Sequence, residues 1–171
     1  MSTADVVQMF NVPMIHYAIE DWRNAKERIT QALPQISEEM LNSNGEIYTD
    51  FFDEQFKHCL PPYGETVIDI LLPYLKDFTG KTRCEFTDMW FQTAKRGMSH
   101  GVHNHGASAF GWCYYVRMPE GASPICFPEA DLTIHPKEGE VIIFPGIVEH
   151  SVPPSDIEEK RIMIASNVGI K

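Results

Sequence analysis

The hydrophobic and polar positions divide the chain into two parts near residue 80. Before it, apolar residues recur every three or four positions, which predicts two amphipathic helices over residues 20–33 and 64–77. Pro73 lies inside the second segment, where we expect it to kink the helix. A short apolar run over residues 12–19 predicts a strand before the first helix.

After residue 80 the pattern changes to short β-like runs separated by segments rich in Gly and Pro. The predicted strands are "RCEFTDMWFQTA", "SAFGWCYYVRM", "PICF", "DLTIH", "EVIIF" and "KRIMIASNV". Many short strands with turn signals between them are typical of an antiparallel sandwich or barrel. The sequence therefore predicts an α+β, mainly β fold, with the helices packed on the outside of a jelly roll. We expect one domain over residues 1–171, with 1–80 as a helical support and 81–171 as the jelly-roll core.

Composition and charge exclude several classes of protein. The net charge of −10 disfavours nucleic acid and anionic membranes as partners, because both need a basic surface. We see no apolar run long enough to span a bilayer and no signal-peptide pattern at the first residues. The four cysteines have no paired spacing, which predicts reduced, mostly buried thiols and a cytoplasmic protein.

Histidines gather in the segment "GMSHGVHNHGAS", residues 97–108. His103 and His105 are two positions apart, so on one strand both rings would face the same way and could chelate a metal ion. His100 falls on the loop side, where we expect a solvated residue or one that supports the ligands. His150 follows the predicted strand "EVIIF" and would complete a facial site of three ligands. Such a site leaves room on iron for a cosubstrate and dioxygen. The alternatives are that His103 and His105 form an accidental pair and that His150 is an exposed turn residue.

Arg161 lies inside an apolar strand, so we expect its guanidinium to be buried. A buried guanidinium needs a carboxylate, either from an Asp or Glu of the chain or from a ligand. Its position after the last histidine favours a ligand. Trp90 and Gln92 alternate onto one face of the strand that leads to the site, where Gln92 contacts cosubstrate or substrate, or bonds within the sheet.

The residues of the second half carry a resemblance to a known family. The segments are "WFQTAKRGMSHGVHNH", "FGWCYYVRMPEG", "EGEVIIFPGIVEHSVPP" and "RIMIASN", within residues 88–169. In this order they resemble the 2-oxoglutarate- and iron(II)-dependent oxygenases of small bacterial and phage type. The resemblance implies a prolyl-hydroxylase-like double-stranded β-helix, with the helices on its major sheet. It also implies His103 and His150 as iron ligands, with Arg161 and Tyr115 on the C5 carboxylate of 2-oxoglutarate.

One residue departs from the family pattern. Most families of this class have Asp or Glu two positions after the first histidine, whereas this chain has His105. Three alternatives follow: His105 is the third ligand, a carboxylate from elsewhere such as Glu129 or Asp131 serves, or the iron chemistry differs. We favour His105 as the third metal ligand.

Two other functions fit part of the pattern. A cupin-type dioxygenase can use three histidines without a cosubstrate, but Ala109 and Phe110 stand where the cupin glutamate should be. A non-enzymatic metal-binding jelly roll would leave Arg161 unexplained. The expected function is therefore a 2-oxoglutarate- and iron(II)-dependent oxygenase that uses dioxygen to hydroxylate a small molecule or a protein side chain. The sequence fixes neither the substrate nor the oligomeric state.

Overall fold

The computed structural model describes residues 12–38, 40–41, 45–56, 59–80 and 83–170. Two antiparallel sheets pack face to face, one in the order β1-β8-β5-β10-β3-β2 and the other in the order β4-β9-β6-β7. The strands of the large sheet are β1 (Ile15–Ala18), β2 (Tyr48–Thr49), β3 (Cys84–Ala94), β5 (Phe110–Arg117), β8 (Glu140–Pro145) and β10 (Arg161–Ile170). Those of the small sheet are β4 (His100–His103), β6 (Ile125–Phe127), β7 (Leu132–Ile134) and β9 (His150–Val152). Short 3₁₀ turns, η1 (Glu54–Phe56) and η2 (Pro128–Ala130), lie in the connections.

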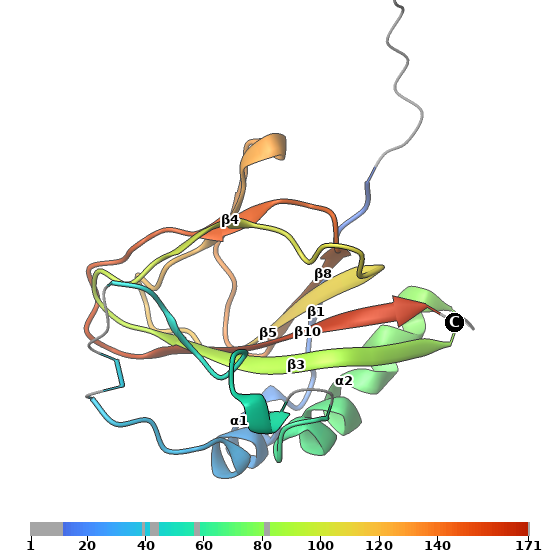
Figure 1. The fold of residues 1–171 in the computed structure, drawn as a ribbon, viewed down its shortest axis with the longest axis horizontal. Helices are drawn as coiled ribbons and strands as arrows, with labels where there is room; N and C mark the ends of the chain where they lie inside the picture. Colours follow the sequence, from blue (N-terminus) through green and yellow to red (C-terminus); the bar gives the residue numbers. More distant parts are fainter. Residues whose placement is uncertain (1–11, 39, 42–44, 57–58, 81–82, 171) are drawn as a thin grey trace, which may run out of the picture.

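Two helices cover the outer face of the large sheet, α1 (Trp22–Ala32) and α2 (Gly64–Thr79). Figure 1 shows both helices below this sheet and β4 on its other side. Val67 and Leu71 of α2 belong to the same buried cluster as Trp112 and Tyr114 of β5. Burial of this apolar face is what holds the helices on the sheet.

A second core fills the space between the sheets. It contains Cys113 and Tyr115 of β5, which alternate with Trp112 and Tyr114 along the strand. The side chains of β5 therefore alternate between the two cores. The candidate site lies at one end of this second core, because Trp90 of β3 belongs to it and also lines the site.

The predicted fold is confirmed, as an α+β, mainly β jelly roll with two helices on the major sheet. The helix predicted over residues 64–77 continues through Pro73 to Thr79. The large sheet also takes in β1 and β2 from the first 80 residues, which pair with β8 and β3 respectively. No helix in the described ranges is long and apolar enough to cross a membrane.

The cysteine prediction was wrong in part. None of the four cysteines, all within the described ranges, forms a disulfide, but only Cys113 is buried, and Cys59 is exposed. Cys59 lies in the connection before α2, outside both cores. The spacing of the cysteines along the sequence does not indicate whether each one is exposed or buried.

Candidate active site

Three histidines come together where β4 meets β9. The two strands are antiparallel, and His103 lies directly opposite His150. His105 follows β4 by two residues, and its backbone N–H donates to the carbonyl of Gly146 at 2.7 Å. The prediction that His105 continues the strand was therefore wrong, but its ring still reaches the other two. One ligand atom from each of the three rings lies within 4.8 Å of the others, so they are placed to bind a metal ion.

Each of these rings has an oxygen acceptor at its Nδ1 atom. The pairs are His103 with the Gly101 carbonyl at 2.9 Å, His105 with Asn167 Oδ1 at 2.6 Å, and His150 with the Val148 carbonyl at 3.2 Å. Nδ1 must carry the hydrogen to donate to these oxygens, which leaves the Nε2 lone pair free on every ring. Nε2 of His105 and Nε2 of His150 face each other at 3.4 Å. The arrangement thus presents three Nε2 atoms to one point, which suits a metal ion.

Asn167 was not identified from the sequence as a site residue. It lies on β10, and its Nδ2 donates to Asp88 Oδ2 at 3.2 Å while its Oδ1 accepts from His105. The bond to Asp88 sets which way the amide points and so makes Oδ1 face His105. Gly111 makes room for the same ring, because a Cβ there would lie 2.9 Å from Nδ1 of His105.

Two of the three histidines, His105 and His150, are kept neutral by burial. His150 is 2% exposed and packs against Phe144, whose ring centre lies 4.7 Å away. Burial lowers the pKa of His150 from 6.5 to about 3, and it also lowers the pKa of His105. Neutral imidazole is the form that binds metals, so the rings are ready to bind at neutral pH. No carboxylate of the described residues joins this group, and Glu129 and Asp131 are exposed.

Arg161 begins β10 and is 2% exposed. None of its Nε, Nη1 and Nη2 atoms has a hydrogen-bond partner in the described chain. An unpaired buried guanidinium is costly, and an anionic ligand would supply the partner that it lacks. The cavity that Arg161 lines is also lined by all three candidate metal ligands.

Tyr115 lies next to Arg161, whose Cζ is 5.5 Å from the centre of the tyrosine ring. Its hydroxyl is buried and has no partner among the described residues. Burial raises the pKa of Tyr115 well above its ordinary value, so the hydroxyl stays protonated and can donate. Tyr115 is not one of the residues that line the cavity, and its contact with a cosubstrate stays a prediction.

His100 and Gln92 form a pair at the edge of the histidine cluster. Gln92 is buried on β3, and its Nε2 lies 3.5 Å from Nδ1 of His100. The ring of His100 stacks on that of His103 with 3.9 Å between centres, and burial lowers the pKa of His100 to about 4. The loop position predicted for His100 was wrong, because this residue begins β4 and is partly buried. Gln92 thus contacts His100 beside the histidine cluster, and its contact with cosubstrate or substrate stays a prediction, as does a bond within the sheet.

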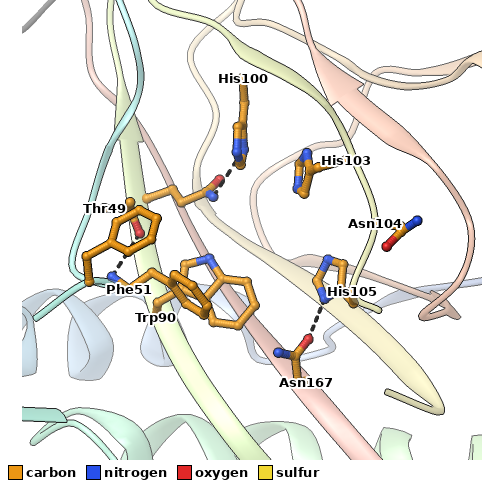
Figure 2. A pocket seen from close by; sticks show the side chains of 10 residues that line it. Thr49, Phe51, Trp90, His100, His103, Asn104, His105 and Asn167 are labelled. Carbon is orange, nitrogen blue, oxygen red and sulfur yellow. Dashed lines mark hydrogen bonds between the residues drawn. The ribbon is translucent and has the colours of Figure 1, made fainter. Parts of the chain in front are cut away.

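An open pocket of about 350 Å³ adjoins the cluster. Figure 2 shows His103 and His105 on one side of it and Phe51 and Trp90 on the other. Its lining residues are Thr49, Phe51, Phe52, Trp90, Gln92, His100, His103, Asn104, His105 and Asn167. The volume is in the range of small-molecule sites.

The comparisons with known proteins agree with this geometry. Residues 128–167 match the family described as "Putative 2OG-Fe(II) oxygenase". This segment contains His150, Arg161 and Asn167. The resemblance to 2-oxoglutarate- and iron(II)-dependent oxygenases is therefore confirmed. A search of curated proteins finds no match.

Several solved structures share the fold. The viral collagen prolyl hydroxylase of Paramecium Bursaria Chlorella virus-1, solved as a 2OG complex, has a TM-score of 0.67 at 17% identity, covering 92% of this chain and 96% of the viral one. A Pseudomonas putida prolyl-4-hydroxylase has a TM-score of 0.58 at 13% identity, covering 94% of each chain. HygX from Streptomyces hygroscopicus, solved with nickel and 2-oxoglutarate, has a TM-score of 0.63 at 9% identity, covering 92% of this chain and 83% of HygX. The enzyme type predicted from the sequence, with Fe(II) and 2-oxoglutarate as cofactors, is that of the matched family, and two of these neighbours were solved with 2-oxoglutarate bound.

Proposed function

We propose that this protein is a hydroxylase that couples the oxidation of 2-oxoglutarate to insertion of oxygen into a C–H bond of a second substrate. The observation that carries the proposal is the buried Arg161, unpaired in a cavity that three histidines share. A guanidinium binds a carboxylate in a planar, two-point fashion, and a dicarboxylic keto acid could occupy the guanidinium and the metal at once.

In this proposal His103, His105 and His150 hold iron(II) through their Nε2 atoms. Arg161 holds the C5 carboxylate, and Tyr115 donates its hydroxyl to the same group. The bound iron and cosubstrate supply the oxidising power, because 2-oxoglutarate and dioxygen give succinate, carbon dioxide and one oxygen atom for the substrate. The chain contributes orientation: the three Nδ1 acceptors fix the imidazoles, and the two packed sheets keep water from the inner cavity.

Anaerobic titration of 2-oxoglutarate into the iron(II)-loaded protein tests this function. We expect a weak visible charge-transfer band when the keto acid chelates the metal, and succinate formation when air is admitted. His150→Ala should lose both the band and the bound iron. Stoichiometric iron without a band would contradict the proposal and favour a cupin-type dioxygenase that needs no cosubstrate.

A further inference from the structure

Two large aromatic side chains are exposed at the mouth of the open pocket. Phe51 is 47% exposed and Phe52 is 80% exposed, and both line the pocket. Exposed apolar side chains that border a cavity mark a binding surface more often than a packing defect. The mechanism proposed above gives them no role.

These phenylalanines end a row of rings that starts at a candidate metal ligand. The ring of His105 lies 5.6 Å from that of Trp90, and Trp90 lies 4.8 Å from Phe51 in an edge-to-face contact. Phe51 is in turn 5.1 Å from Phe52, again edge to face. Figure 2 shows Phe51 and Trp90 together on the side of the pocket opposite His103. The row therefore leads from the candidate metal site to the surface.

The turn that carries the phenylalanines is held in place by a buried carboxylate. Asp50 accepts hydrogen bonds from the Tyr63 hydroxyl at 2.8 Å and from the backbone N–H of Phe91 at 2.9 Å. The backbone N–H of Phe51 donates to Thr49 Oγ1 at 3.1 Å. Asp50 is 7% exposed, so its bonds to Tyr63 and Phe91 are shielded from water. The orientation of Phe51 is thus set before any ligand binds, which lowers the entropic cost of binding.

The lining of the pocket has no charged side chain that could hold an ion. None of its residues is Lys, Arg, Asp or Glu. The amides of Gln92 and Asn167 are engaged with His100 and His105. On the side of Phe51 and Trp90, a carboxylate, phosphate or ammonium group would therefore find no charged side chain as a partner.

We propose that Phe51, Phe52 and Trp90 form the platform for the oxidised substrate, a small uncharged molecule that lays an apolar ring on them. This inference rests on the proposed function in one respect, because it takes the pocket beside the histidines to be the substrate site. A volume of about 350 Å³ suits a small molecule with one or two rings. Ring-on-ring contacts with Phe51 and Trp90 supply the affinity, and the lack of a charged partner supplies the selection.

Ligand-observed NMR with three matched probes tests the substrate class. Benzyl alcohol, benzoate and benzylamine share a ring and differ in charge, and each is titrated into the metal-free full chain without 2-oxoglutarate, so that no probe can bind a metal ion. We expect benzyl alcohol to bind at least fivefold more tightly than either charged probe. In protein loaded with paramagnetic cobalt(II), the benzyl alcohol signals should broaden, because the pocket adjoins the candidate metal ligands.

Phe51→Ala and Phe52→Ala should each weaken benzyl alcohol binding at least fivefold. Ile170→Ala is the matched control, because Ile170 is 49% exposed at the far end of β10 and should leave binding unchanged. Equal or tighter binding of a charged probe, or unchanged binding in both Phe variants, would overturn the proposal. So would binding of the neutral peptide acetyl-Gly-Phe-Gly-amide without binding of benzyl alcohol, which would assign the platform to a polypeptide.

The NMR titration separates this inference from the function on which it rests. It uses the metal-free chain and no cosubstrate, whereas the function is read from the charge-transfer band of the iron(II) protein. A band without selective probe binding refutes only the substrate class. Selective probe binding without a band keeps the apolar platform and refutes the oxygenase.

Discussion

Arg161→Met is expected to stabilise the free protein while it removes the binding of 2-oxoglutarate. The guanidinium is buried, and none of its nitrogens has a partner in the described chain. Burying an unsatisfied polar group costs about 1–3 kcal/mol, and more when the group is charged. Methionine fills much of the same space without that cost. Allowing for the lost contact with the Tyr115 ring, we expect a gain of about 2 kcal/mol.

Thermal unfolding of zinc-loaded protein, with and without 2-oxoglutarate, measures both effects. For a chain of this length, about 2 kcal/mol corresponds to a rise of roughly 4–8 °C in Tm. A ligand at a hundred times its Kd stabilises the wild type by about 2.7 kcal/mol, a shift of roughly 5–11 °C. Arg161→Met should start higher and shift by nothing. Arg117→Met is the control, because Arg117 is exposed at the end of β5 and its loss should change neither value.

Two results would refute the reasoning about Arg161. A free Arg161→Met protein several degrees less stable than wild type would mean that the guanidinium has a partner within the chain. A variant that keeps the full ligand shift would mean that 2-oxoglutarate binds elsewhere. Either result would favour the internal salt bridge that the sequence left open.

Three further predictions concern the histidine cluster. Gly111→Ala places a methyl group 2.9 Å from Nδ1 of His105, so calorimetry should show that the variant binds zinc about tenfold more weakly than wild type. Gly101→Ala is the control, because its added Cβ meets open space, and it should bind zinc normally. Equal zinc affinities of the two variants would mean that the His105 ring has room to move. Asn167→Leu removes the acceptor at the same Nδ1 and should weaken zinc binding about 10–100-fold in that assay, and unchanged affinity would show that the amide does not fix the tautomer. Burial lowers the pKa of His150 from 6.5 to about 3, so a proton binds His150 more tightly in the unfolded chain than in the folded one. The free energy of unfolding of the metal-free protein should therefore fall as the pH drops below about 6.5. At pH 5 the loss from this side chain is about 2 kcal/mol in urea unfolding, and His150→Ala should lack that part; identical pH profiles would contradict the low pKa.

The fold could be predicted from the sequence because its signals are local. Apolar residues at helical spacing gave α1 and α2, and short runs between Gly- and Pro-rich segments gave the long strands. In β5 the period of two of a strand accounts for the facing of each side chain in the structure, with Tyr115 between the sheets and Tyr114 toward the helices. Where the signal is weak the prediction failed: β9 has only three residues, and its pairing with β4 depends on contacts across the small sheet.

The site could be predicted only where residue chemistry is unusual. Clustered histidines and an arginine in an apolar strand are rare enough to be noticed without a structure. Asn167 and Phe51 are common residue types, and their roles arise from partners far away in the sequence. Asn167 reaches His105 from 62 positions away, and Asp50 fixes the turn of Phe51 through Phe91, 41 positions away. Such contacts have no local pattern, so no reading of the sequence alone could have found them.

The two cavities beside the histidines differ in the ligand charge that they accept. The inner cavity contains Arg161, and three neutral imidazoles would leave a bound divalent metal its full charge, so it favours a dianion such as 2-oxoglutarate. The outer pocket has no charged residue and an aromatic wall, so it favours an uncharged ring. Gln92 and His100 line both cavities and lie at their boundary. Of these two cavities, Arg161 lines only the inner one and the phenylalanines line only the outer pocket, so in the proposed function the dianionic cosubstrate and the uncharged substrate would each find their partners in a different cavity.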